Sequence, residues 1–403
     1  MDSLKELFKI GNGPSSSHTM GPERAAKKFK SENPDAVSFR VELYGSLAAT
    51  GRGHLTDSVI IETLSPRHTE IIWKPEIVHD YHTNGMKFIS LDGNGGITRE
   101  WLVFSVGGGT IMEEGESRHG LTKVYSLSTM TEIMEWCEIN RKEMWEYVEE
   151  MEGPSVWEFL QNIWEAMENC VKTGINKTGV LPGTLKYPRK AQSFYRKARR
   201  DNSRNGFTGR IFAYTLAVSE ENGGGGRVVT APTCGASGAI PGLLYALKEE
   251  YKLSDDEVLK GLAIAGLIGN MIKENATISG AEGGCQAEIG TACSMAAGMT
   301  TFILGGSIKQ IEYAAEIALE HHLGLTCDPI GGYVQVPCIE RNAAAAVRAL
   351  DSANYSLYTD GQHVVSFDQV VLTMKETGMD LRCEYKETSL GGLAKMQILS
   401  STG

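Results

Sequence analysis

The stretch Met130-Thr131-Glu132-Ile133-Met134-Glu135-Trp136-Cys137 begins the pattern that decides the fold. From here on, apolar residues recur at the spacing that is typical of amphipathic helices. One helix is expected to run from Ile133 to Val148, and the next is expected over 156–167. Further helices are expected over 210–220, 237–251, 254–273, 285–303, 308–322, 339–350 and 366–376. Only two short strands, 227–229 and 333–336, are expected within this part.

The residues before Met130 follow a different pattern. Val37, Phe39, Val41 and Leu43 alternate with polar neighbours, which indicates a half-buried strand. Glycine-rich turns follow two more expected strands, at 86–91 and 101–104. Two helices, near 22–30 and 56–63, interrupt the strands. We therefore expect an α+β protein, with a mixed α/β domain over 1–145 and an all-helical domain over 146–403.

Length and composition point to a soluble enzyme. The 403 residues are enough for two or three domains, each with its own core. A net charge of -11 argues against a nucleic acid or an anionic membrane surface as a partner. The first residues lack the apolar run of a signal peptide, and the longest apolar stretch, 261–272, is too short to span a bilayer. We expect a cytoplasmic location, where thiols stay reduced.

Three cysteines in loop-forming surroundings, Cys285, Cys327 and Cys338, look suited to a metal centre. Each lies beside, or one residue from, a glycine or a proline that places the thiolate on a turn or at a helix start. Three soft thiolates suit zinc or an iron–sulfur cluster. A structural site closes its metal with four protein ligands, so a set of three predicts a catalytic centre with one open position.

The remaining cysteines give weaker signals. Cys137 and Cys170 fall on amphipathic helices, where core packing is favoured. Cys293 follows Cys285 on the same expected helix, and packing is favoured over ligation there as well. Cys234 occupies a glycine-rich loop before a helix, and a pocket-lining role and a packing role both stay open.

A cluster of hydroxyl residues forms the second strong signal. Ser15, Ser16, Ser17, His18 and Thr19 directly precede Pro22, which suits the first position of a helix. The unpaired N–H groups of a helix start, with several hydroxyls beside them, make a site for a carboxylate. An ordinary helix cap in a polar loop is the alternative, but one cap needs fewer such residues, so a binding role is favoured.

His54 lies in a similar setting. It follows Gly51 and Gly53, which let a backbone approach a ligand closely, and it precedes the helix start at Thr56. A capping histidine and a functional histidine fit this position equally well.

Taken together, these motifs resemble the iron–sulfur-dependent L-serine dehydratases, also called L-serine ammonia-lyases. The resemblance covers nearly the whole chain. It includes 13–22, Leu43-Tyr44-Gly45-Ser46-Leu47 with Gly53-His54, 104–109, 179–183, 226–233, Ser279-Gly280-Ala281-Glu282-Gly283-Gly284-Cys285-Gln286, 324–329, 334–342 and Glu387-Thr388-Ser389-Leu390-Gly391-Gly392. So many long matches in one order are specific to the family.

The resemblance implies an α/β domain followed by an all-helical domain, in a protein that forms a homodimer and acts on L-serine. It also implies a [4Fe–4S] cluster with three cysteine ligands and one uncommitted iron. By position, the ligands are Cys285, Cys327 and Cys338. Some relatives end in a cysteine that caps the open iron, but residues 393–403 contain none, so capping by the tail is not expected here.

The residue types suggest a division of labour for the elimination. We expect His54 to be the base that removes the α-proton, because an imidazole is half neutral near physiological pH. Ser15, Ser16, Ser17 and Thr19, with His18 among them, are expected to hold the carboxylate and orient the substrate. The two domains would then meet over the cluster.

Three alternatives stay open beside this interpretation. A pyridoxal-phosphate enzyme would need a Schiff-base lysine, and Lys309 lies on an ordinary helix start. An amino-acid sensor would bind serine with the hydroxyl loops and keep zinc as a structural metal. The same elimination on threonine or cysteine is also compatible with the sequence.

Overall fold

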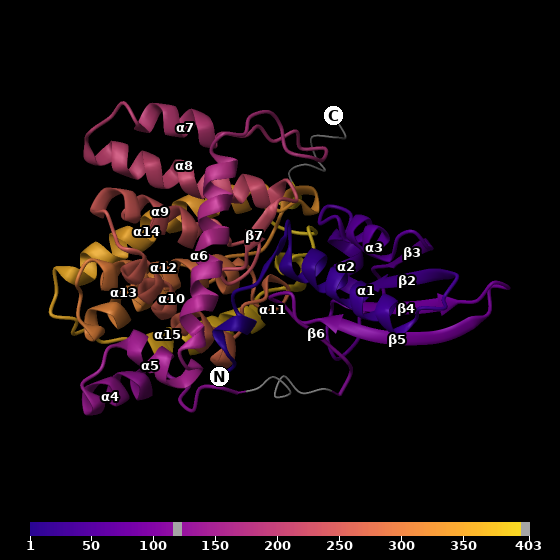
Figure 1. Cartoon of the computed structure of the whole chain (residues 1–403), viewed down its shortest axis with the longest axis horizontal. Helices are drawn as coiled ribbons and strands as arrows, with labels where there is room; N and C mark the ends of the chain where they lie inside the picture. The colour runs from indigo at the N-terminus through magenta and orange to yellow at the C-terminus, as the bar shows by residue number, and fades with distance from the viewer. Residues whose placement is uncertain (116–122, 396–403) are drawn as a thin grey trace.

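The computed structural model describes residues 1–115 and 123–395, which form two lobes of unequal size. In Figure 1 the helical lobe lies on the left and a sheet covered by helices lies on the right. The predicted α+β class, with a mixed sheet in the N-terminal region followed by a helical region, is confirmed. None of the described helices combines the length and the apolar character needed to cross a bilayer.

The smaller lobe is built on a five-stranded sheet with the order β3-β2-β4-β5-β6. Its strands are β2 (Ser38–Tyr44), β3 (His68–Lys74), β4 (Gly85–Leu91), β5 (Ile97–Ser105) and β6 (Ile111–Met112). Only β2 and β3 run parallel. The alternation along β2 buries Phe39 and Val41 against α1 (Gly21–Glu32), while Arg40 faces away and pairs with Glu70. Helices α2 (Gly45–Thr50) and α3 (Thr56–Leu64) complete this core.

The larger lobe is a bundle in which α12 is the buried central helix. Its helices are α4 (Met130–Asn140), α5 (Met144–Glu152), α6 (Ser155–Gly174), α7 (Ala191–Ala198), α8 (Arg204–Gly223), α9 (Ala239–Tyr251), α10 (Asp255–Asn275), α11 (Gly280–Gly283), α12 (Thr291–Ile303), α13 (Ile308–Glu320), α14 (Cys338–Leu357) and α15 (Phe367–Asp380). Helix α12 packs against α9, α10, α13 and α14, and its side chains from Thr291 to Thr301 are buried.

The first residues of the chain belong to the core of the helical lobe. Leu4, Leu7 and Phe8 are buried there, and β1 (Ile10–Asn12) pairs antiparallel with β7 (Arg227–Val229). The chain then crosses to the smaller lobe at α1. The core of the smaller lobe uses buried residues between 25 and 103. The domain boundary predicted at 145/146 stays a prediction.

Two local predictions were wrong, and one strand was missed. The helix expected from Ile133 to Val148 is two helices, α4 and α5, because Arg141 takes a left-handed conformation with φ 54° and ends the first one. The strand expected at 333–336 is instead a turn before α14. In this turn the side chain of Gln335 donates a hydrogen bond to the carbonyl of Pro182. Strand β3 was missed because its residues are only partly buried and show no clean alternation.

Candidate active site

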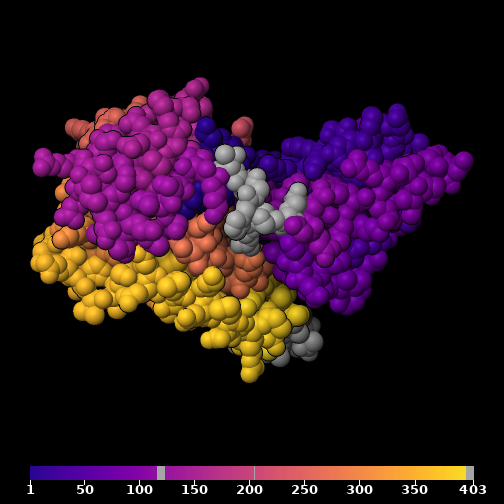
Figure 2. All heavy atoms as spheres, turned by 90° about the horizontal axis from the view of Figure 1, so that it is seen from below, coloured from indigo at the N-terminus to yellow at the C-terminus, as the bar shows by residue number. Residues whose placement is uncertain are grey.

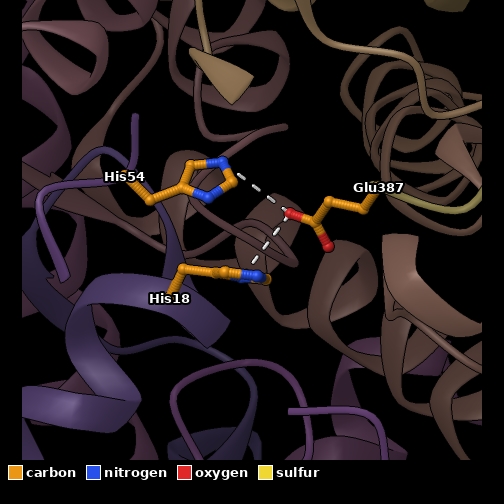
Figure 3. A group of neighbouring side chains, drawn as sticks. All are labelled: His18, His54 and Glu387. Atoms are coloured by element: carbon orange, nitrogen blue, oxygen red, sulfur yellow. Dashed lines mark ion pairs between the residues drawn. The ribbon is translucent and has the colours of Figure 1, made fainter. Parts of the chain in front are cut away.

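The two predicted histidines come together with a carboxylate from the far end of the chain. Figure 3 shows His18 and His54 facing Glu387, which lies on the C-terminal segment. Oε1 of Glu387 is 3.7 Å from Nδ1 of His18 and 3.9 Å from Nε2 of His54. The two imidazole rings lie 4.5 Å apart, and both are fully buried. The site therefore joins residues that are more than 330 positions apart.

Two threonines tie the histidine loops to each other. The Thr19 hydroxyl donates to the carbonyl of His54 at 2.7 Å, and the Thr56 hydroxyl donates to the carbonyl of His18 at 2.5 Å. Pro22 lies four residues after His18 and has no N–H to offer that carbonyl. These two hydrogen bonds hold the two histidine loops together. They join threonine hydroxyls to the backbone carbonyls of the histidines and do not involve the imidazole rings.

Burial keeps this group of side chains neutral. It lowers the pKa of His18 to about 4, with a smaller effect from His82. Burial, and then the neighbouring His18, lower the pKa of His54 well below its ordinary value. Burial, followed by the negative charge of Glu288, raises the pKa of Glu387 well above its usual range. The contacts with Glu387 therefore join neutral partners in the absence of a ligand, and His54 can accept a proton.

The hydroxyl cluster is largely engaged in bonds of its own. Ser15 caps the turn over Ser16–Met20 by accepting from the N–H of His18, and the Thr19 hydroxyl accepts from the N–H of Ser15. The Ser17 hydroxyl lies 2.8 Å from Nδ1 of His18. Within the described residues the Ser16 hydroxyl makes no hydrogen bond. Thus the cluster mainly shapes the loop and orients His18, and Ser16 is left to meet a ligand.

His54 stands out because neither of its ring nitrogens has a hydrogen-bond partner within 1–115 and 123–395. Buried polar atoms are usually paired, so two unpaired atoms on one buried ring call for an explanation. A bound substrate or metal would supply the partner. The sequence alone left its role open between a cap and a functional residue. The structure shows no side-chain cap at the start of α3, which removes the capping role.

The three predicted metal ligands lie together on the helical side of the same region. Cys285 directly precedes the turn over Gln286–Gly290, and Cys338 is the first residue of α14. Cys327 lies beside the C-terminal segment, because its N–H donates to Tyr385 and its carbonyl accepts from the N–H of Glu387. Burial, followed by the negative charge of Glu387, raises the pKa of Cys327. The N–H of Gln286 donates to the carbonyl of Leu325, which places the turn after Cys285 beside the segment that carries Cys327. One backbone ladder therefore links Cys327 directly to Glu387.

The spacing of these sulfurs bears on the kind of metal centre they could hold. Around a single tetrahedral zinc, Zn–S bonds of about 2.3 Å put the sulfurs roughly 3.8 Å apart. Among the described residues, the one group of three ligand atoms that lie within 4.8 Å of one another is His18, His54 and Glu387, not the cysteines. The three sulfurs do not form such a group among the described residues. The imidazoles and the carboxylate are themselves a possible metal-binding group.

Burial raises the pKa of each thiol, to about 11 for Cys285, and Arg341 opposes this shift at Cys285 and Cys338. Arg341 lowers the pKa of Cys285 and bonds to the carbonyl of Thr326 and to Asp328. A metal must displace the thiol protons, and a fixed positive charge favours that exchange. The three thiols therefore have the donor chemistry of metal ligands, with a positive charge beside them.

Sequence reasoning missed two acidic residues in this region. Glu387 appeared only inside a matching motif, without a role. Glu288 accepts a hydrogen bond from Thr233 at 2.6 Å, and a Cβ placed on Gly280 would lie 2.6 Å from its Oε2 and 3.3 Å from Sγ of Cys327. No periodic pattern marks either residue, although the local π-helical turn that carries Glu288 is a frequent feature of functional sites.

Two further cysteines make packing contacts, although Cys234 directly follows Thr233, which bonds to Glu288. Cys293 is fully buried in α12, where its thiol contacts the carbonyl of Ala345. Cys234 is also buried, and its sulfur lies 3.8 Å from that of Met20. Both contacts are those of packed side chains.

Comparison with known proteins gives an identification that agrees with this geometry. The family model of the serine dehydratase alpha chain matches residues 126–394, and that of the beta chain matches residues 3–70. The L-serine dehydratase of Streptomyces coelicolor is 42% identical, over 97% of this chain and 98% of the relative. That of Haemophilus influenzae is 39% identical, over 98% and 99%, and L-serine dehydratase 1 of Escherichia coli is 37% identical, over 98% and 99%. The chain therefore belongs to the serine dehydratase family, with its beta-chain and alpha-chain parts joined in one polypeptide.

Proposed function

We propose that the protein is a cytoplasmic L-serine ammonia-lyase that converts L-serine into pyruvate and ammonia. One observation carries the proposal. Glu387 is joined through the backbone to Cys327 on the helical side and faces His18 and His54 on the other. A metal-ligand set and an acid–base set thus meet at one residue, which is what an elimination without a carbonyl cofactor requires.

A [4Fe–4S] cluster held by Cys285, Cys327 and Cys338 would supply one iron without a protein ligand, a Lewis acid that weakens the bond to the departing hydroxyl. The rest of the chemistry falls to side chains of this chain. Ser16 and His18, the latter oriented by Ser17, would hold the substrate carboxylate.

His54 would accept the α-proton. Its ring is neutral, and its nitrogens have no hydrogen-bond partner among the described residues. A lone pair is therefore available to the substrate. The electrons of the C–H bond then form the C=C bond while the C–O bond breaks and hydroxide leaves. The resulting imidazolium would lie about 3.9 Å from Oε1 of Glu387, and a carboxylate at that distance stabilises the positive charge. The aminoacrylate tautomerises and is hydrolysed to pyruvate and ammonia.

Anaerobic reconstitution followed by iron, sulfide and pyruvate determinations tests the proposal. We expect iron and sulfide to be retained in equal amounts, and serine to yield pyruvate and ammonia. The variant Cys327→Ala should lose iron, whereas Cys293→Ala, which changes a packed thiol, should keep it. Serine binding with a zinc-loaded protein and no pyruvate would favour the sensor interpretation and contradict the lyase.

We also propose that two copies of the chain form a homodimer through the helical lobe. A groove of about 1190 Å³ runs between α7, α8, α13 and α14. Tyr355 and Val364, which line it, are 59% and 97% exposed, and a group of exposed apolar side chains is typical of a protein–protein interface. The groove also holds Arg348, which has no ion-pair partner among the described residues, and Glu316, whose pKa burial raises to about 8. A two-fold axis could bring each Arg348 to the Glu316 of the partner.

Light scattering of the wild type and of Val364→Asp tests this surface. We expect the mass of two chains for the wild type and of one chain for Val364→Asp. The control Val37→Asp, at a 57% exposed position on the other lobe, should stay dimeric. A wild-type monomer, or a dimer that survives Val364→Asp, would contradict the proposed surface.

A further inference from the structure

Two carboxylates of the site, Glu288 and Glu387, pair with no lysine or arginine in the part of the chain that the structure describes. Glu387 is buried between the histidines and Cys327, and Glu288 lies beside the sulfur of Cys327. A Cβ on Gly280 would lie 2.6 Å from Oε2 of Glu288 and 3.3 Å from Sγ of Cys327, and the carbonyl of Cys327 accepts a hydrogen bond from the N–H of Glu387. The two acids therefore border the same small region, together with Cys327.

The charges in this region are unbalanced. Among the described residues, neither Glu288 nor Glu387 forms an ion pair with a lysine or an arginine. The nearby Arg341 is engaged with Asp328 and the carbonyl of Thr326. A negative charge buried without a cation is costly, and Glu387 is buried in this way. A ligand that brings a positive charge would relieve this cost.

Oε2 of Glu288 is also available to such a ligand. Its Oε1 accepts the Thr233 hydroxyl, while Oε2 has no hydrogen-bond partner in the described part of the chain. Gly280 and Gly235 keep the space beside this carboxylate open, since a Cβ at either position would lie 2.6 Å and 3.2 Å from its oxygens. Two glycines around one unpaired carboxylate oxygen leave room for a small group to approach.

We propose that Glu288 and Glu387 together bind the α-ammonium group of the amino-acid substrate. The inference rests on the proposed lyase function and adds the subsite that distinguishes an amino acid from a hydroxy acid. An ammonium held by Glu387 would bring the adjacent Cα–H next to His54, whose Nε2 is 3.9 Å from the same carboxylate oxygen. A bound ammonium also favours the ionised carboxylates, which can then stabilise the imidazolium.

The ligand pair L-alanine and L-lactate tests the subsite without turnover. The two share a carboxylate and a methyl group, and they differ only in an ammonium against a hydroxyl. Neither has a β-hydroxyl to eliminate. We expect calorimetry on the reconstituted wild type to give at least about tenfold tighter binding of alanine, since hydrogen bonds between charged groups are the strong ones. Equal affinities in the wild type would overturn the proposal whatever the variants do.

Isosteric variants assign the preference to the two acids. Glu288→Gln and Glu387→Gln should each lose most of the preference for alanine, keep the affinity for lactate, and raise KM for serine by about tenfold or more. The control Glu384→Gln changes a partly exposed acid on the same segment and should behave as the wild type. Retention of the wild-type alanine-to-lactate ratio in both site variants would refute the inference. Absence of pyruvate from wild-type serine reactions would instead refute the lyase function, independently of this binding result.

Discussion

Gly53 lies where the His54 loop touches the loop that leads to Cys338, and it offers a sharp perturbation of the site. A Cβ at residue 53 would lie 2.6 Å from the carbonyl oxygen of Gly332 and 2.7 Å from its carbonyl carbon. Ordinary contact begins at 3.4 Å, so the substitution Gly53→Ala forces the two backbones apart by roughly 0.8 Å. No side chain can rotate to relieve this contact, because both clashing atoms belong to the backbone.

The displacement moves His54 relative to Glu387 and the cysteines. A misplacement of about 1 Å in a catalytic constellation can cost about 10²-fold in rate. We therefore expect kcat for serine to fall by about 10²-fold in Gly53→Ala, with iron content and the core of the helical lobe unchanged. The matched control is Gly93→Ala in the same lobe, where an added Cβ meets nothing within 4 Å.

The assay is pyruvate formation by anaerobically reconstituted protein, with iron content and the thermal midpoint measured on the same samples. Turnover of Gly53→Ala within about twofold of Gly93→Ala, at equal iron content, would refute the reasoning that close apposition of the two loops sets the rate.

Three further predictions concern the same region and its surroundings. His54→Ala should lower turnover by roughly 10²–10⁴-fold while iron is retained, and unchanged turnover would eliminate His54 as the base. Thr56→Val leaves the buried His18 carbonyl without that donor and should lower the free energy of unfolding by about 1–3 kcal/mol in urea titrations, whereas Thr373→Val, on an exposed helix face, should lower it far less. Burial lowers the pKa of His322 to about 4. Between pH 6.5 and 4 this residue is therefore protonated in the unfolded chain and neutral in the folded chain. Stability should therefore fall as the pH drops from 6.5 towards 4, by roughly 2 kcal/mol between pH 7 and 5 from this residue, and His322→Gln should lose that part of the pH dependence. An identical pH dependence in His322→Gln would contradict the assignment.

The parts of the fold that the sequence predicts are those with a regular apolar period. The alternation at Phe39 and Val41 located β2, and Pro22 located the start of α1. Strand β3 escaped because it lies at the edge of the sheet, where partial burial erases the alternation. The break at Arg141 escaped because the apolar period continues through it. Local pattern does not encode a single residue with positive φ.

The site divides in the same way. The cysteines and the hydroxyl cluster could be recognised in the sequence by residue type and by neighbouring glycines or prolines. Glu387 could not be placed, because it lies in an irregular segment with φ 58°, and its partner Cys327 lies 60 residues earlier. Glu288 lies on a turn whose apolar neighbours resemble those of any helix. Contacts made across the chain by irregular backbone are set by tertiary packing, which the sequence pattern does not display.

The candidate site lies between the two lobes, where the C-terminal segment that carries Glu387 meets the histidines of the smaller lobe. Figure 2 shows the C-terminal segment along the underside of the helical lobe, reaching towards the sheet-bearing lobe. This course brings Glu387 to the histidines and lets Ser46 of the smaller lobe donate a hydrogen bond to its carbonyl at 3.1 Å. The segment therefore couples the metal side of the site to its acid–base side.

Mössbauer spectroscopy of ⁵⁷Fe-enriched, anaerobically reconstituted protein tests most directly whether three cysteines leave one iron open to the substrate. The predicted result is that L-serine changes about one quarter of the iron absorption, since one iron in four lacks a protein ligand. An iron spectrum that stays unchanged while serine is bound and turned over would contradict it.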